Sequence, residues 1–570
     1  MNRQPPPALP TGSPGPPLAG STGPEDAGST EEDRRWPLIV LLVALVWAIV
    51  PLAPALARGE IPGSPFTDLY PSVWGLGWFA QHQPGLPGWC SDIAAPAGVP
   101  FYYSSPIHGW VGWPLVALGA ALGARGVVWG YVGTLIIART AAVAVAWGAL
   151  RALGSARLPA LGGALLYGAS PFFHGYAVEG IIEGTDGWAL PLWVWCVAVP
   201  RRSTALGRIV ALLASAAALW LCVLSSWYLG MVACAGAVLW GLWRREAWGS
   251  LLGLVGAVPL LLAFASMATG AKPLPDAVRI AMGLQPLFQA PGWRQSNPFA
   301  ITTWVGLTAP LIAVGWAAMG PAGGRAGSRW LVAGVVLAGV LSSGWGPWYS
   351  LPVLRSVRFP YRWHAGTLFL LAVLVSRAGS AWSGRWTWLT LLPWLEGYVL
   401  SPVEPILPGS PAGVSAIYAK VRGPLLLDLP GPIALPPGVM NPSRPRARYL
   451  LYAQLFHPAD SPWVLDFNSV GGASRPAWLD GFAAWEPTLD NSGAPVDIAG
   501  ARAAGVSQIL VHTRELHGET PLLLAALKDA GCTIKDERDG LVLLGLPPAA
   551  GSPAPPPPPS PAPPRSLPPR

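Results

Sequence analysis

The stretch WPLIVLLVALVWAIVPLAPALA, residues 36–57, has no charged side chain and is long enough to cross a lipid bilayer. The whole chain has the same character, because 52% of its 570 residues are hydrophobic and only 11% are charged. Ordinary soluble domains contain about 25% charged residues. The sequence therefore predicts a mainly α-helical, polytopic membrane protein built as a helix bundle.

Apolar runs of this kind recur along most of the chain, and a membrane-spanning helix needs about 20 predominantly apolar residues. We predict about eleven spans, at 36–57, 127–149, 158–173, 187–200, 205–224, 227–243, 249–268, 300–319, 330–344, 364–380 and 386–401. The segment IHGWVGWPLVALGAALG, 107–123, is ambiguous, because it is short and contains His108 and Pro114. It either crosses the membrane or lies along the interface as a juxtamembrane helix.

Arginine placement favours a juxtamembrane helix at 107–123, since cytoplasmic loops collect positive charge. If this segment does not cross, alternation of the other spans places most arginines between spans on the cytoplasmic side, together with the N-terminus. The segments then expected outside are 58–126, 174–186, 225–226, 269–299, 345–363 and everything after about 402.

The two ends of the chain differ from the rest. Residues 1–35 are rich in Pro, Gly, Ser, Thr and acidic residues, and 549–570 are mostly proline, so both are expected to be disordered tails. Between the last span and the proline tail, 402–548 contains the strand-like stretches GPLLLDLPGPIAL, SPWVLDFNS, VSQILVHTRE and LVLLGLPP, and the amphipathic helix TPLLLAALKDAG. We predict a small extracytoplasmic α/β domain there, after a transmembrane domain of 36–401.

Several classes of protein and site are not indicated. The five cysteines show neither disulfide nor zinc spacing, no P-loop or dinucleotide fingerprint is present, and the basic residues are scattered instead of forming a face for nucleic acid. Abundant Ala, Gly, Pro and Arg with only four lysines suggests a GC-rich bacterial genome. We therefore expect a bacterial inner (plasma) membrane protein.

The expected outside segments contain the residues that could do chemistry. Asp68 follows the first span, FFHGYAVEGIIEGTDGW contains His174, Glu179 and Glu183, and LPVLRSVRFPYRWH contains three arginines, Arg355, Arg358 and Arg362. Carboxylates thus come mostly from early loops and guanidiniums from late ones. If these loops meet, they form a cleft with an acid or base on one wall and an anion clamp on the other, for which the planar fork of arginine is suited.

Arg139 lies in the middle of a predicted span, in YVGTLIIARTAAVAV. A charge there costs about 2.5–3.5 kcal/mol on insertion scales, so the side chain should face the bundle interior or a polar partner. A carboxylate of the 174–186 loop or a phosphate is a candidate partner for a substrate-binding role, and a contact between helices is the structural alternative.

The external Asp68, SDIAAPAGVPFYYSSPIHG, GASPFFHGYAVEGIIEGTDGWALPLWVW, LSSWYLGM and RSVRFPYRWHAG together resemble the multispanning GT-C glycosyltransferases, over about residues 36–400. The likeness is to an uncharacterised bacterial branch, whose members often end in a small external domain with a GVSQILVH-like strand. The resemblance implies transfer of a sugar from a polyprenyl phosphate carrier on the outer face of the membrane. Asp68 matches the acid of the first loop, which in that family acts as a base on the acceptor or helps to hold a metal. Many GT-C enzymes have two acids in this motif, whereas TDLYP has one.

This chemistry agrees with the residues present, because glycosyl transfer needs a base for the incoming hydroxyl and cations for the leaving phosphate. Asp68 is the expected base. Arg355, Arg358, Arg362 and Arg139 are expected to bind substrate with Glu179, Glu183 and His174, and a divalent metal is an open alternative. The expected partners are membrane lipid, a lipid-linked sugar, in the first instance a hexose, and an acceptor that is a glycan, lipid or protein.

Other roles remain for these residues and for the whole chain. Asp68 could be a turn or N-cap residue, the late arginines could interact with lipid headgroups, and Glu179 with Glu183 could flank a sugar for hydrolysis. The chain itself could instead be a non-catalytic carrier or assembly factor for envelope polysaccharide or lipid. A carrier should show charged or broken helices at mid-membrane and symmetry between its halves.

Overall fold

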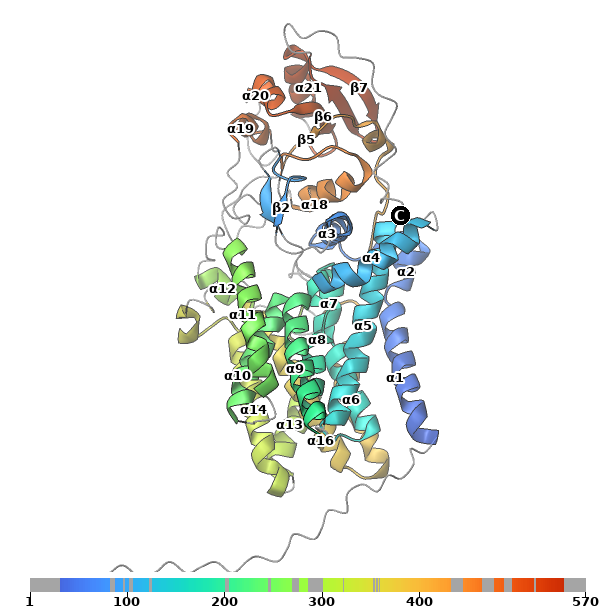
Figure 1. Cartoon of the computed structure of the whole chain (residues 1–570). Coiled ribbons are helices and arrows are strands. Elements are labelled where there is room, and N and C mark those ends of the chain that lie inside the picture. The colour runs from blue at the N-terminus through green and yellow to red at the C-terminus, as the bar shows by residue number, and fades with distance from the viewer. Residues whose placement is uncertain are drawn as a thin grey trace, which may run out of the picture.

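A helix bundle carries a smaller α/β unit at one end in the computed structural model (Figure 1). The structure describes residues 31–82, 88–95, 98–101, 106–121, 126–199, 204–243, 248–268, 276–284, 301–320, 322–351, 354, 357, 359–431, 444–463, 476–485, 495–516 and 519–547. The two predicted disordered tails lie almost entirely outside these residues.

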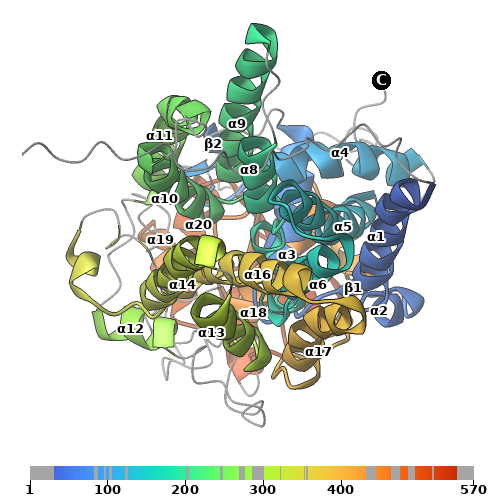
Figure 2. The same ribbon diagram turned by 90° about the horizontal axis from the view of Figure 1, so that it is seen from below.

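The helices of the bundle run side by side (Figures 1 and 2). They are α1 (Glu31–Ile49), α5 (Gly126–Ala152), α6 (Arg157–Gly168), α8 (Ala189–Ala198), α9 (Ala205–Ser225), α10 (Trp227–Trp243), α11 (Trp248–Ala268), α13 (Thr308–Met319), α14 (Ala322–Ser342), α16 (His364–Ala381) and α17 (Leu392–Val399). Among the described residues, α5 and α9 alone have both the length and the apolar composition to cross a bilayer unaided, and several shorter apolar helices accompany them.

Prolines divide some of the predicted spans, since proline cannot donate the helical hydrogen bond. The first run is split near Pro51 into α1 and α2 (Ala53–Ala57). The third is split at Ser170, whose hydroxyl accepts a hydrogen bond from the Phe173 amide and so begins α7 (Pro171–Val178). The last run is a 3-10 segment, η6 (Gly384–Leu391), followed by α17.

The remaining helices and turns of the bundle gather at the end that faces the α/β unit (Figure 1). They include α2, α3 (Leu69–Gln81), α4 (Pro106–Ala121), α7, α12 (Asp276–Leu284) and the 3-10 turns η1 (Ile182–Gly184), η4 (Pro347–Ser350) and η5 (Pro360–Trp363). Helix α4, the ambiguous segment of the sequence, packs against the first turns of α5, where Gly112 faces Thr134 and Gly130 faces Val116. The described parts of the segments expected outside thus share one end of the bundle.

The α/β unit is built on a four-stranded mixed sheet with the order β5-β6-β8-β7. Strand β5 (Leu425–Leu429) is parallel to β6 (Val506–His512), and β8 (Leu541–Gly545) is antiparallel to both β6 and β7 (Thr533–Arg538). Helices α18 (Arg444–Ala453), α19 (Trp478–Ala483), α20 (Ile498–Ala503) and α21 (Thr520–Asp529) and the turns η7 (Ala416–Lys420) and η8 (Gln454–Phe456) complete it. The predicted strand SPWVLDFNS falls mostly outside the described residues.

The loop that follows α2 forms part of this unit. Strand β1 (Ile61–Pro62) pairs with β4 (Gly409–Ser410), and β2 (Gly88–Cys90) pairs with β3 (Val99–Phe101). Trp74 and Trp78 of α3, together with Cys90 and residues 93–95, belong to the same buried apolar cluster as the sheet residues Leu427 and Ile509. The loop and the C-terminal segment therefore share one hydrophobic core.

Candidate active site

Asp68 lies at the N-terminus of α3, and hydrogen bonds hold this segment against the turn after α7. Two backbone amides and two hydroxyls of the segment donate to three successive carbonyls of that turn. The pairs are Ser64 N to Val178 O (2.6 Å), Thr67 Oγ1 to Glu179 O (2.5 Å), Asp68 N to Glu179 O (3.1 Å) and Ser72 Oγ to Gly180 O (2.7 Å). The first loop and the 174–186 loop are thus joined at Asp68 and Glu179.

The closeness of the two segments depends on Gly180. Its φ is +68°, and a Cβ added there would lie 2.4 Å from the Cα of Leu69. Real Cβ atoms do not approach another carbon so closely, and a positive φ is rare for residues other than glycine. Glycine at this position therefore permits α3 to begin directly against the turn.

The side chain of Asp68 does not act as a helix cap. The residue occupies the N-cap position of α3, but within the described part of the chain its carboxylate accepts no capping hydrogen bond. It is half-buried, whereas Glu179 is 3% exposed. An aspartate at this position often caps the helix with its side chain, but Asp68 does not.

Tyr361 of η5 lies within electrostatic reach of both acids. Burial raises the pKa of the Tyr361 phenol above its usual range, the neighbouring guanidinium of Arg362 opposes this, and the carboxylates of Asp68 and Glu179 raise the pKa further. The phenol consequently stays protonated near neutral pH and can donate a hydrogen bond.

Arg362 forms the opposite side of this cluster. Its Nη1 lies 3.2 Å from Oε1 of Glu183, and its side chain is 8% exposed. The guanidinium carbon is 4.0 Å from the ring centroid of Tyr228 and 5.5 Å from that of Tyr176. Its Nε has no hydrogen-bond partner among the described residues. The ring of Phe359 lies 5.0 Å from the same guanidinium carbon, so one carboxylate and three aromatic rings hold the cation, and this Nε is buried.

A buried contact between a histidine and a carboxylate braces the same end of the bundle; burial lowers the pKa of His108 to about 3, so the imidazole is neutral near pH 7. His108 Nε2 of α4 lies 3.1 Å from Oδ1 of Asp186, and both side chains are at most 2% exposed. The indole Nε1 of Trp188 donates to the same carboxylate oxygen at 2.8 Å. This pair fixes α4 to the segment that also contains Glu179 and Glu183.

Arg139 and His174 form a second cluster. An Arg139 Nη2 atom lies 3.2 Å from His174 Nδ1 and 3.5 Å from the Trp47 carbonyl oxygen, and the guanidinium carbon is 5.1 Å from the Trp47 ring. His174 Nε2 lies 2.8 Å from the carbonyl oxygen of Glu404. These contacts join α1, α5, α7 and the segment after α17, and give the deep arginine polar partners.

The structure therefore brings together four of the eight predicted site residues, Asp68, Glu179, Glu183 and Arg362. It places Arg139 and His174 together in the second cluster, and Arg355 and Arg358 lie outside the described residues. Sequence reasoning did not single out three tyrosines that complete the first cluster, Tyr176, Tyr228 and Tyr361. Each stands in one of the motifs on which the GT-C resemblance rests, and that position was the available signal.

A divalent metal would need several converging ligands. In the ranges that the structure describes, no group of three His, Cys, Asp or Glu side chains is arranged to hold a metal ion. Glu183 is directed to Arg362, so Asp68 and Glu179 are the two carboxylates of the first cluster that a metal could share. Metal dependence stays a prediction.

Comparisons with solved structures show where this architecture recurs. The chain superposes on the cryo-EM structure of the arabinofuranosyltransferase AftD from Mycobacteria with a TM-score of 0.56, over 90% of this chain and 40% of that one, at 16% identity. A mutant form of AftD gives a TM-score of 0.53 over 90% and 41% of the two chains, also at 16% identity. The chain thus spans about 40% of the length of that enzyme.

Weaker likeness extends to ArnT from Cupriavidus metallidurans, solved with undecaprenyl phosphate bound, with a TM-score of 0.43 at 14% identity over 91% and 99% of the two chains. No protein-family model matches the chain. No curated protein matches it either. The chain has the fold of the GT-C glycosyltransferases, which are polytopic membrane proteins.

Proposed function

We propose that this chain is an integral-membrane glycosyltransferase that transfers a sugar from a polyprenyl phosphate carrier to an envelope acceptor. One observation carries the proposal. Asp68, Glu179, Glu183, Tyr361 and Arg362 come from three loops far apart in the sequence and meet at the end of the bundle under the α/β unit. The motifs that supply them are those that resemble the GT-C enzymes.

Asp68 would act as the general base in this reaction. The acceptor hydroxyl loses its proton to the carboxylate, its oxygen forms a bond to C1 of the sugar, and the bond between C1 and the phosphate oxygen breaks. The polyprenyl phosphate leaves with the electron pair of that bond. Glu179 would hold the sugar hydroxyls, and Tyr361 would donate a hydrogen bond to the sugar or to the leaving oxygen.

Arg362 would stabilise the negative charge that develops on the leaving phosphate. It is fixed by Glu183, Tyr176 and Tyr228, and its buried Nε has no hydrogen-bond partner within the described residues. A guanidinium fixed in advance loses little entropy on binding phosphate oxygens. The sequence adds Arg355 and Arg358 as further cations of the same loop, and a metal shared by Asp68 and Glu179 would supply additional positive charge.

The proposal includes a topology. The N-terminus lies in the cytoplasm, about eleven segments cross the bacterial inner membrane, α4 lies along the interface, and the cluster with the α/β unit above it faces outward. The gathering of all described outward segments at one end of the bundle supports this arrangement. The carrier's isoprenoid tail would then lie against the bundle, with its phosphate at the cluster.

Purified protein in lipid nanodiscs, incubated with radiolabelled polyprenyl phosphate hexoses and pentoses and with candidate acceptors, tests the proposal. We expect transfer by the wild type and a loss of about 100-fold or more in kcat for Asp68→Asn, within the range of general acid-base catalysis. Asp92→Asn, in the same loop, is the matched control and should keep wild-type turnover. Absence of turnover with every donor, by a folded wild-type protein, would favour a non-catalytic role.

A further inference from the structure

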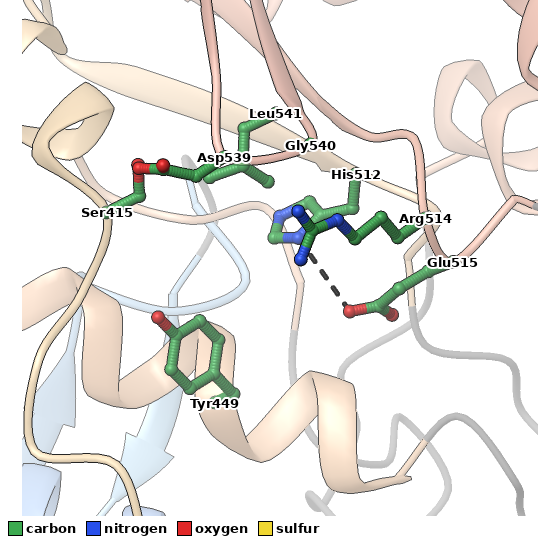
Figure 3. Close-up of a pocket in the computed structure, with 8 residues that line it drawn as sticks. All are labelled: Ser415, Tyr449, His512, Arg514, Glu515, Asp539, Gly540 and Leu541. Carbon is green, nitrogen blue, oxygen red and sulfur yellow. Dashed lines mark hydrogen bonds and ion pairs between the residues drawn. The ribbon is translucent and has the colours of Figure 1, made fainter.

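A second site lies in the α/β unit, away from Asp68. A pocket of about 310 Å³ opens between the sheet, α18 and the linker that follows β4 (Figure 3). Its volume is at the small end of the roughly 300–1,000 Å³ range of small-molecule sites. The residues that line it are Ser415, Tyr449, His512, Arg514, Glu515, Asp539, Gly540 and Leu541.

Backbone geometry forms the rim of this pocket. Asp539 and Gly540 join β7 to β8 with φ values of +56° and +77°, as in the two-residue hairpin turns that Asp-Gly favours. A Cβ at Gly540 would lie 2.8 Å from Nε of Arg514, so glycine lets the arginine lie across the turn. Asp539 in turn accepts a hydrogen bond of 2.6 Å from the Ser415 hydroxyl.

His512 is fixed at the base of the pocket by buried polar partners. Its Nε2 lies 3.3 Å from Oδ1 of Asp428 and 3.4 Å from the Tyr418 hydroxyl. Its Nδ1 lies on the side of Glu515, 3.9 Å from that carboxylate (Figure 3). The His512 side chain is 5% exposed and that of Asp428 is 4% exposed. Burying His512 and Asp428 together costs free energy unless they bind each other, and their contact through Nε2 leaves Nδ1 directed toward the pocket.

The lining selects a class of ligand by its mixture of charges. Asp539 and Glu515 oppose the binding of an anion, and Arg514 opposes the binding of a metal cation. Carboxylates, a guanidinium, an imidazole and a hydroxyl together match the alternating donors and acceptors of a neutral polyhydroxylated ring. The phenol ring of Tyr449 supplies an apolar face on which such a ring can pack.

The pocket is also connected to the proposed catalytic helix. Tyr449 contacts Tyr70 of α3 with ring centroids 5.5 Å apart, and Tyr452 stacks on Tyr70 at 5.0 Å. The Tyr70 hydroxyl donates to the carbonyl of Pro411, in the linker that leads to Ser415. Tyr70 is two residues after Asp68. One wall of the pocket therefore rests on the helix that begins at the expected base.

We propose that this pocket binds one sugar residue of the acceptor glycan and so holds the acceptor next to α3. The assignment rests on the proposed glycosyltransferase function and extends it, since it defines the acceptor as a carbohydrate chain. Binding a residue at a distance from the reacting hydroxyl uses binding energy outside the reacting centre to position that hydroxyl.

The test measures glycan binding to the full-length protein in nanodiscs by saturation-transfer NMR and calorimetry. The probes are methyl glycosides of pentoses and hexoses and their short oligosaccharides. We expect at least one to bind the wild type, and Arg514→Gln and Glu515→Gln to weaken its binding about 10-fold or more. Lys535→Gln and Asp529→Asn, on the same unit outside the pocket, are the controls and should bind as the wild type does.

Three results would each overturn the assignment of the pocket to a sugar. The first is that folded wild-type protein binds none of the probes. The second is that both pocket variants bind the glycoside as tightly as the wild type does. The third is that inorganic phosphate or Ca²⁺ displaces the glycoside.

Asp68→Asn separates this proposal from the previous one, because the variant should bind the glycoside while losing turnover. If the wild type binds the glycoside but shows no turnover, the glycosyltransferase proposal fails and the pocket is still a sugar-binding site. If it shows turnover but binds no glycoside, the pocket proposal fails and the glycosyltransferase proposal stands.

Discussion

The backbone amide of Asp68 donates a hydrogen bond to the carbonyl oxygen of Glu179 at 3.1 Å. Five helices of the described chain, α3 to α7, lie between the two residues in the sequence, and this hydrogen bond joins them directly in the structure. This contact places the acid of the first loop beside the acids of the next one. The two loops are therefore joined by hydrogen bonds to backbone carbonyls, and the integrity of the candidate site can be tested apart from its chemistry.

Gly180→Ala should displace the start of α3 and reduce transferase activity, because its Cβ would clash with the Leu69 backbone. The positive φ alone costs on the order of 1–3 kcal/mol for a non-glycine residue. Gly59→Ala is the matched control, since Gly59 has a φ of +70° and nothing within 4 Å of the added Cβ. Thermal unfolding and turnover of both variants measure the difference. Equal losses in the two would show that the contact with Leu69 is unimportant.

Arg362→Lys should lower kcat although the positive charge is kept, because lysine loses the planar fork that meets Glu183 and packs on the Tyr228 ring. We expect a fall of at least about 10-fold, and one of about 100-fold or more for Arg362→Gln, as for loss of one oxyanion-stabilising donor. Arg58→Gln, which removes an exposed guanidinium paired with Glu60, is the control. Wild-type kcat in Arg362→Gln would exclude Arg362 as the phosphate-binding cation.

His108 and Asp186 should be strongly coupled in stability. Both are buried and 3.1 Å apart, so a double-mutant cycle with His108→Phe and Asp186→Asn is expected to give a coupling free energy of about 1–3 kcal/mol. The exposed pair Arg58–Glu60 should give about 0–1 kcal/mol in the same assay. Denaturant unfolding in bicelles measures both cycles. Coupling as small as that of the surface pair would mean that the buried pair does not brace α4.

The two ends of the bundle should face different compartments. His82, at the end of α3, and Ser383, between α16 and η6 at the opposite end of the bundle, are both exposed. In a cysteine-free background, His82→Cys should react with an impermeant maleimide on intact cells, and Ser383→Cys should react only after permeabilisation. Labelling of position 383 alone on intact cells would invert the topology and contradict an outward-facing site.

The sequence predicted the helical membrane class well, because runs of apolar residues report burial in lipid or in the bundle directly. It could not predict how α3 and the turn after α7 meet. That contact depends on hydrogen bonds to three backbone carbonyls and on the close approach at Gly180, and neither produces a periodic pattern in the sequence. The same holds for Tyr176, Tyr228 and Tyr361. An aromatic residue near a membrane surface is most often an interfacial anchor, and only the fold shows that two of these rings surround one guanidinium.

Partners of buried charges were equally hard to predict. Arg139 required a polar neighbour, and the sequence proposed a carboxylate or a phosphate. The structure supplies an imidazole and a backbone carbonyl, both compatible with a positive charge. The participation of Cys90 and residues 93–95 in the C-terminal core could not be predicted either, because the order of segments along a chain does not state which of them pack together.

The pairing of β1 with β4, and the residues of the first loop inside the C-terminal core, define which pieces of this protein can be exchanged. A cut at residue 402 would leave the membrane part with an unpaired strand and would strip a set of apolar side chains from the detached part. A chimaera between related chains should therefore inherit 58–101 and 402–547 from the same parent. A domain boundary drawn along the sequence would separate these two segments, although they form one folded unit and have to be exchanged together.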